Sequence, residues 1–309
     1  MLSRQWGRHR GSALVEVLMA VLIGTGILAA ATGLYVLQVR IHTQLDSSLH
    51  RLGVAAMAFQ LLSADVRAAR GNPCGQGVTL HRDHMTAQSG WWAMLEGWSA
   101  GLRGYGGEEA LPGVGFGAGS SQRVRGTDAL ELHNGLVDAH PLRVYAPEAG
   151  YFQLKSGFPD FLPGELLVAC SLSSALIFPA RRVNGPDVSA PGPLDIDGEQ
   201  GAGAMLSRYR PLRWYIAHNP AGRRSLYQQR IENGVVTGYE MIEGVSGLTL
   251  EYLLDTASGF VSTAQVAGRW AQVRAVRVGL MLDGVQADQG GSGHRVQFTV
   301  ALRNELPVR

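Results

Sequence analysis

The sequence predicts an α+β fold in which one long N-terminal helix packs on an antiparallel, β-rich head with long loops. Three observations carry this prediction. An apolar run extends from Ser12 to about Leu37. After it, apolar residues recur every three or four positions up to about Arg70, which is the period of a helix. From residue 126 onward the apolar residues alternate with polar ones, which is the period of a strand.

The N-terminal apolar run is long enough to cross a hydrocarbon layer of about 30 Å as a helix. A leader of residues 1–11 precedes it and contains Arg4, Arg8 and Arg10. Because positive charge stays on the cytoplasmic side, the chain is expected to cross the inner membrane once and to place its C-terminal part in the periplasm. We assign residues 12–39 to this membrane half of the helix. Glu16 is the one charge within it, and a charge in a span is costly enough to indicate a function.

Residues 40–71 are expected to form the amphipathic half of the same helix. Its apolar stripe comprises Ile41, Leu45, Leu49, Leu52, Ala56, Phe59, Leu62 and Val66. Gly71, Asn72 and Pro73 then end the helix. The width of the stripe favours a helix that covers the chain's own head over a coiled-coil stalk.

The head is assigned to residues 72–309. Short strands are predicted at 129–132, 165–169, 213–216, 248–254, 276–282 and 296–302. Two stretches are predicted as exposed loops: a Gly/Trp-rich one at about 97–126 and a Gly/Pro-rich one at about 184–203.

The composition argues against nucleic acid as a partner and leaves open whether the two cysteines form a disulfide. The net charge is +2 and falls to about −1 without the leader arginines, so no strong field attracts nucleic acid. The two cysteines, Cys74 and Cys170, lie on the side expected to be periplasmic, where disulfides form. A bridge between them would close a loop of about a hundred residues, worth about 4–5 kcal/mol. Two unpaired thiols are the alternative.

We find no set of residues that would support catalysis, a metal or a cofactor. His81 and His84 flank Asp83 but lack a third ligand at a fixed spacing. The segment Asp195-Ile-Asp197-Gly198-Glu199 lacks the later glutamate of a calcium loop, so a turn is the better interpretation. No G-x-S-x-G nucleophile motif occurs. The sequence therefore predicts a protein that is not an enzyme.

Gly11, Ser12 and Glu16 together resemble the processing signature of type IV prepilins and pseudopilins. The resemblance implies that a membrane prepilin peptidase cuts after Gly11 and methylates the new terminus at Ser12. It also implies that Glu16 pairs with the terminal amine of a neighbouring subunit when helices bundle. The family usually has Phe where this chain has Ser12, so whether Ser12 is methylated stays open. An uncleaved single-span anchor is the alternative interpretation.

Later segments resemble the PilW-type minor pilins of type IV pilus systems. They include Asp65-Val-Arg67, Asp128-Ala-Leu130-Glu-Leu132, Gly164-Glu-Leu-Leu-Val-Ala-Cys170, Val273-Arg-Ala-Val-Arg277 and Phe298-Thr-Val-Ala-Leu-Arg-Asn304. The resemblance implies a type IV pilin-like fold and a structural role in a minor-pilin complex that primes pilus assembly and occupies the tip. The implied partners are other minor pilins and the major pilin. We add the hypothesis that the Gly/Trp-rich loop at about 97–126 contacts a tip adhesin. Two other functions are left open, a J-type pseudopilin of type II secretion and a membrane-tethered periplasmic binding module.

Overall fold

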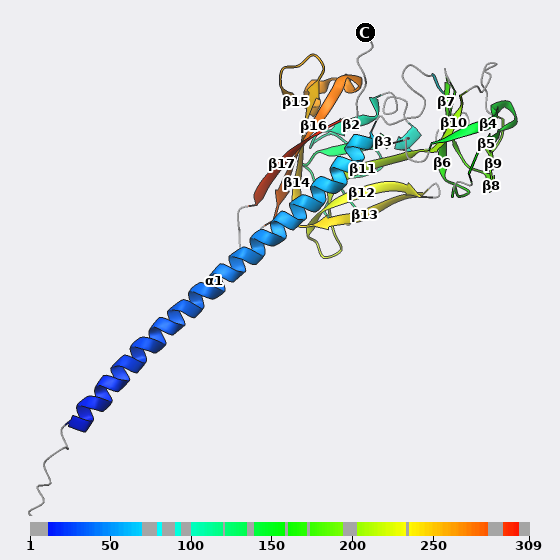
Figure 1. The fold of residues 1–309 in the computed structure, drawn as a ribbon. Helices are drawn as coiled ribbons and strands as arrows, with labels where there is room; N and C mark the ends of the chain where they lie inside the picture. The colour runs from blue at the N-terminus through cyan, green and yellow to red at the C-terminus, as the bar shows by residue number, and fades with distance from the viewer. Residues whose placement is uncertain are drawn as a thin grey trace, which may run out of the picture. The chain divides into compact units, whose positions relative to one another are not determined.

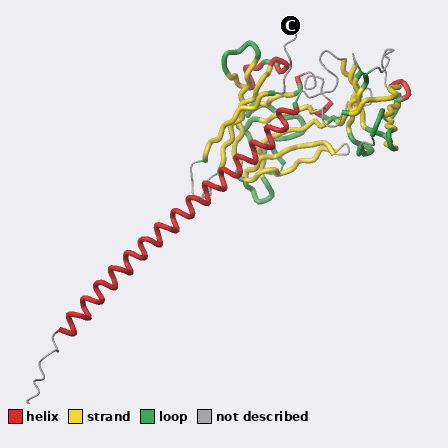
Figure 2. Tube along the Cα trace, viewed as in Figure 1, coloured by secondary structure: helices red, strands yellow, loops and turns green. Residues whose placement is uncertain are grey.

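The computed structural model describes residues 12–69, 79–81, 90–93, 100–119, 121–134, 139–157, 160–171, 174–193, 203–232, 235–283 and 293–302. The chain divides into two units, Met1–Gly53 and Val54–Arg309, which are treated separately below. Strands account for far more of the second unit than helix does, as the tube in Figure 2 shows. The architecture is therefore α+β, as predicted.

Helix α1 (Ser12–Ala68) is one uninterrupted helix of 57 residues (Figure 1). At 1.5 Å per residue it is about 85 Å long. Its end falls two residues before the predicted stop at Arg70, and a single bridge between Ala69 and Asn134 follows at once. The helix belongs to the first unit up to Gly53, and its remaining residues, 54–68, belong to the second unit.

The described residues of the second unit form three sheets, and among the strand pairs described there every one but β1–β7 is antiparallel. The five-stranded sheet has the order β13 (Val235–Glu243), β12 (Arg224–Glu232), β11 (Arg210–His218), β3 (Ala129–Asn134), β2 (Leu102–Tyr105). The four-stranded sheet has the order β15 (Phe260–Ser262), β14 (Val245–Leu254), β16 (Val273–Leu282), β17 (His294–Ala301). Short helices α3 (Thr263–Val266) and η3 (Trp270–Gln272) connect β15 to β16.

The eight-stranded sheet is largely an insertion between two neighbouring strands of the five-stranded sheet. Its order is β1 (Thr79–His81), β7 (Ser174–Pro179), β6 (Leu166–Cys170), β10 (Met205–Arg208), β4 (His140–Ala146), β5 (Tyr151–Leu154), β9 (Asp187–Ser189), β8 (Arg182–Asn184). After β3 the chain leaves the five-stranded sheet, forms β4 to β10, and returns to that sheet as β11, which pairs directly with β3. The insertion has its own apolar core, in which Phe152 stacks on Phe178 with ring centroids 4.9 Å apart.

The main core lies where the end of α1 meets the five- and four-stranded sheets. Ala58, Leu62 and Val66 of α1 are buried in one cluster with Trp214 and Tyr252 of the sheets. The predicted apolar stripe of the helix is therefore only partly the face that packs on the sheets. Leu62 and Val66 are buried, whereas Phe59 stays 37 % exposed and meets Phe298 edge-on. The helix turns its small residue Ala58 toward the sheets because a small side chain permits close approach.

All six predicted strands are present, as β3, β6, β11, β14, β16 and β17. The loops are less extensive than predicted. The 97–126 stretch contains β2 and is organised by Arg123, which is fully buried. Its guanidinium donates to the carbonyls of Gly106 and Glu109 at 2.7 Å. The 184–203 stretch contains β9, and residues 194–202 lie outside the described part of the chain.

Glycine is required inside β2 because the four-stranded sheet approaches closely there. A Cβ at Gly104 would lie 1.9 Å from the hydroxyl oxygen of Tyr252. No side chain fits in that space, so the glycine-rich composition of this stretch partly reflects packing rather than mobility.

A polar contact fixes the end of α1 to the five-stranded sheet. The Asp65 carboxylate accepts hydrogen bonds from the indole N–H of Trp214 at 2.9 Å and from the Gln228 amide at 2.6 Å. Burial raises the pKa of Asp65, and these two donors together with the charge of Arg230 oppose the rise. The carboxylate thus satisfies two polar groups that the covering helix has removed from water.

We predict that Asp65→Ala lowers the free energy of unfolding by about 1–3 kcal/mol, because both donors lose their acceptor in a buried place. Asp65→Asn keeps an acceptor oxygen and should cost less. Urea unfolding of the detergent-solubilised protein measures both, with Gln60→Ala on the exposed side of the same helix as the control. Equal stability of the Ala variant and the wild type would show that the contact does not hold the helix.

Candidate functional site

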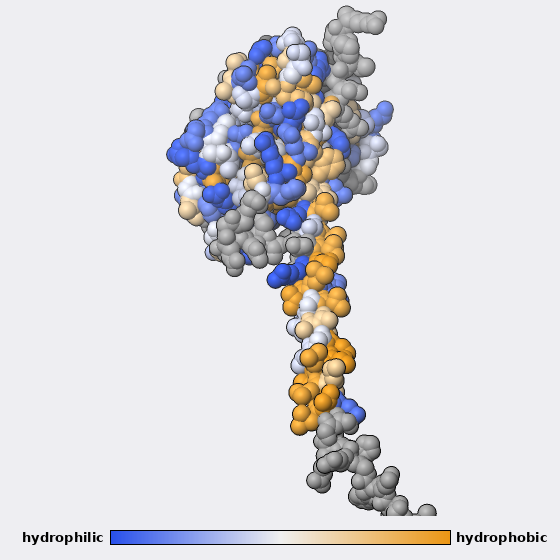
Figure 3. Space-filling view, turned by 90° about the vertical axis from the view of Figure 1, so that its left-hand side faces the viewer, coloured by the Kyte–Doolittle hydropathy of each residue, from blue (hydrophilic) through white to orange (hydrophobic). Residues whose placement is uncertain are grey.

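The first unit presents an apolar helix that no other described residue of the chain buries. Leu14–His42 is long and apolar enough to cross a membrane, with 29 residues and a mean hydropathy of 2.3. None of its most apolar 18-residue window is buried. The space-filling view in Figure 3 shows apolar side chains along this part of the helix. By length and composition, this segment is a candidate membrane anchor or signal.

Glu16 lies on the exposed surface of α1, four residues after its first residue, Ser12. Residues four apart share one face of a helix, so Ser12 and Glu16 lie on the same side. Gly11, the predicted processing position, lies outside the described residues. The roles predicted for all three positions stay predictions.

The head contains a buried cluster of charged and aromatic residues that the sequence analysis did not identify. Its centre is the carboxylate of Glu131, which is 1 % exposed. One carboxylate oxygen accepts from Arg213 Nε at 2.8 Å and from the Tyr105 hydroxyl at 3.0 Å. The other oxygen lies 2.9 Å from His133 Nε2. One carboxylate therefore joins β2, β3 and β11.

Aromatic groups enclose this cluster. The Arg213 guanidinium lies 3.8 Å from the ring centroid of Trp91 and donates to the carbonyl of Pro112 at 2.5 Å. His133 Nδ1 lies 2.6 Å from the Tyr209 hydroxyl, which also donates to the carbonyl of Trp92 at 3.0 Å. Trp91 and Trp92, which precede the predicted loop at about 97–126, thus pack against the sheet, while Trp98 lies outside the described residues.

Electrostatics keeps Glu131 ionised despite its burial. Burial alone would raise the pKa of this carboxyl group, but the hydrogen bond and charge of His133 and the charge of Arg213 outweigh burial, so the pKa is lowered. Burial lowers the pKa of Arg213, which Glu131 opposes, and a guanidinium stays charged in proteins. Burial also raises the pKa of Tyr209 well above its usual value.

The order Tyr209–His133–Glu131 is that of a proton relay, but the geometry does not present it to a substrate. Tyr209, His133 and Glu131 are each no more than 3 % exposed. The Tyr209 hydroxyl already has two protein partners. We therefore interpret the cluster as a structural cross-link.

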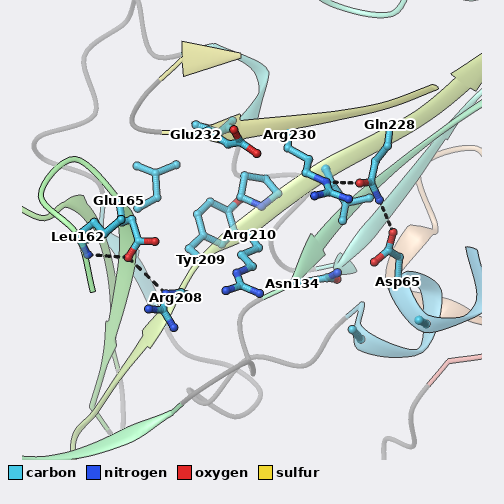
Figure 4. Close-up of a pocket in the computed structure, with 16 residues that line it drawn as sticks. Asp65, Asn134, Leu162, Glu165, Arg208, Tyr209, Arg210, Gln228, Arg230 and Glu232 are labelled. Atoms are coloured by element: carbon cyan, nitrogen blue, oxygen red, sulfur yellow. Dashed lines mark hydrogen bonds and ion pairs between the residues drawn. The ribbon is translucent and has the colours of Figure 1, made fainter. Parts of the chain in front are cut away.

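A pocket of about 750 Å³ opens in the head beyond the end of α1 (Figure 4). Helix α1, the β11–β12 pair, the end of β3 and the β6–β10 region each contribute to its wall. The wall is mixed in character. Its charged members are Asp65, Glu165, Arg208, Arg210, Arg230 and Glu232.

The remaining sequence candidates fall mostly outside the described residues. Cys74, Asp83, His84, Asp195, Asp197 and Glu199 all do, and of His81 only the backbone, in β1, is described. Within the described part of the chain, no group of three or more His, Cys, Asp or Glu side chains is arranged to hold a metal. Cys170, in β6, is disulfide-bonded. Its pairing with Cys74 stays a prediction.

A pattern in the sequence contained a sign of the buried cluster. Strand β3 places all six of its residues, Ala129–Asn134, in the interior, including Glu131, His133 and Asn134. Polar residues on both faces of a buried strand require partners from other elements. Tyr105 is 26 positions from Glu131, and Arg213 and Tyr209 are 82 and 76 positions from their partners in β3, so spacing alone could not identify them.

The fold and the N-terminal segment define an α+β protein with an apolar helix suited to a membrane and a β-rich head. Residues 213–305, under a third of the chain, match the family model described as Type IV Pilus-assembly protein W. The match covers β11 to β17. It supports a type IV pilus-related protein involved in pilus assembly. No curated protein and no solved structure matches the chain.

We predict that Glu131→Gln lowers the free energy of unfolding at neutral pH by about 3–5 kcal/mol, because Arg213 is left as a buried charge without a counter-charge. The pH dependence gives a second readout. A carboxyl group whose pKa is lower in the folded state adds stability above its unfolded value of about 4.5, and that stability is lost as pH falls through the lowered pKa.

Unfolding free energies of the wild type and Glu131→Gln should therefore converge as the pH falls below about 4.5. Glu148→Gln, on an exposed turn, is the matched control and should show no such convergence. A constant difference between wild type and Glu131→Gln from pH 7 to pH 3 would contradict the assignment of charge to this carboxylate.

Proposed function

We propose that the protein is a PilW-like minor pilin that takes part in type IV pilus assembly as a structural, non-catalytic subunit. The observation that carries the proposal is the combination of the family match at residues 213–305 with an exposed apolar N-terminal helix. The proposed fold is a type IV pilin-like one. The leader signature at Gly11, Ser12 and Glu16 agrees with this role.

In this proposal the precursor sits in the inner membrane with a single span and a periplasmic head. The prepilin peptidase removes residues 1–11 and acts on the new terminus at Ser12. The apolar helix then leaves the lipid and packs among the helices of other minor pilins and the major pilin. The protein functions in the complex that primes the filament and occupies its tip, and it needs no nucleic acid, metal or cofactor.

The role of Glu16 follows from the cost of a charge in an apolar environment. A carboxylate and an ammonium that are each unfavourable in lipid become tolerable as a pair. Cleavage after Gly11 creates such an ammonium at Ser12 of every processed subunit. Because Ser12 and Glu16 of one helix share a face, a neighbouring helix shifted along the axis can pair its terminus with this Glu16.

We expect the mature protein to begin at Ser12. Intact-mass spectrometry of the protein purified from membranes should show the loss of residues 1–11, with or without one added methyl group. Gly11→Val should block cleavage because the processing signature that the chain resembles is cut after glycine. A wild-type protein that keeps Met1–Gly11 would contradict the proposal and favour a permanently tethered protein.

We predict that Glu16→Ala is cleaved normally but is depleted at least about tenfold from sheared filaments, since its partner ammonium would be left unpaired. Immunoblots of membrane and filament fractions measure both. Glu16→Asp shortens the side chain but keeps the charge and should be intermediate. Wild-type incorporation of the Ala variant would contradict the pairing.

A further inference from the structure

The pocket beyond the end of α1 contains a buried polar group without a partner. Asn134, at the end of β3, is 4 % exposed and lines the pocket. Its carboxamide oxygen Oδ1 has no hydrogen-bond partner among the residues that the structure describes. Leaving such an oxygen without a donor is costly, and native proteins rarely do so. A ligand that supplies an N–H would explain this position.

The guanidinium of Arg210 lies beside the Asn134 carboxamide oxygen. Arg210 of β11 is the direct cross-strand partner of Asn134, so the two side chains project from the same face of the sheet. Figure 4 shows them next to each other in the pocket. Arg210 is exposed, and within the described residues its side chain forms no hydrogen bond or ion pair, although its charge helps to lower the pKa of Asp160. The pocket therefore offers a hydrogen-bond acceptor adjacent to a guanidinium whose N–H groups have no protein acceptor.

The other charged side chains of the pocket have protein partners. Asp65 accepts from Trp214 and Gln228. The Glu165 carboxylate forms an ion pair with Arg208, with Oε2 and Nε 3.3 Å apart, and the Glu232 carboxylate accepts a hydrogen bond from the Tyr239 hydroxyl. The guanidinium of Arg230 donates to Gln228. Ligand recognition is thus left to Arg210 and Asn134.

Apolar side chains of α1 and β11 form another part of the wall. Ala64 and Ala68 come from α1, and Leu212 follows Arg210 by two positions on the same face of β11. A volume of about 750 Å³ is in the range of sites that enclose a small ligand or a few residues of a peptide.

We infer that this pocket binds the carboxyl-terminal residue of a polypeptide, with its free carboxylate on Arg210, its own backbone N–H on Asn134 Oδ1 and an apolar side chain against Ala64, Ala68 and Leu212. A terminal residue carries its carboxylate and its N–H on the same Cα, which matches adjacent cross-strand partners. An internal Asp or Glu places its carboxylate further from its N–H. The carboxylates of Asp65 and Glu232 at the wall disfavour a multiply charged anion such as a phosphate.

The inference concerns the head alone and does not depend on the pilus assignment. The full-length protein in detergent is immobilised and incubated with two synthetic hexapeptide pools. Both pools end in Val, Leu or Ile after five randomised positions; one has a free carboxylate and the other an amide. Mass spectrometry counts the retained peptides. We expect the free-acid pool to be retained at least about tenfold better, since a guanidinium–carboxylate contact is strong.

Two substitutions connect the result to the pocket. Arg210→Gln, at an exposed position, should abolish the preference for the free acid, whereas Arg182→Gln on the exposed β8 strand should leave it unchanged. Asn134→Asp keeps the side-chain shape but adds a charge that repels a carboxylate, so it should also abolish retention. A thermal melt checks that the variants fold. Retention of neither pool, equal retention of both, or a preference that survives Arg210→Gln would overturn the inference.

Discussion

The interior of the head depends on one carboxylate. Glu131 receives Arg213, Tyr105 and His133, and through them it joins three strands and the segment that carries Trp91. A charge pair of this kind contributes little net stability over an apolar pair of equal volume, but its geometry is exacting. Because an incorrectly paired strand would leave Arg213 or Glu131 buried alone, we infer that the cluster helps to specify the register of β2, β3 and β11.

The sequence predicted what depends on local periodicity. The extent of α1 and six strands were predicted because apolar residues at a fixed interval define each of them. Strands such as β12 and β13 were missed because their exposed and buried residues do not alternate cleanly in hydropathy, although their long pairing makes them regular. The 97–126 region looked irregular because its order depends on Arg123, and a single buried arginine leaves no periodic signal.

The pocket could not be predicted from the sequence because its residues are far apart along the chain. Asn134 and Arg210 are neighbours only because β11 returns to pair with β3 after the whole insertion. The predicted processing and assembly positions differ from the pocket residues, because they are close together in the sequence. Gly11, Ser12 and Glu16 are close in sequence, so their spacing alone suggested a role, and the fold adds only that Ser12 and Glu16 share a helix face.

The insertion of β4 to β10 between two paired strands has a mechanical consequence. A pull on the last turns of α1 reaches β11 and β12 through Asp65 and the shared core, and both strands belong to the five-stranded sheet. The inserted lobe lies to the side of that route, since it departs from β3 and re-enters at β11. Tension would thus load the sheet and spare the lobe, which can keep its own packing while the rest of the head is under strain.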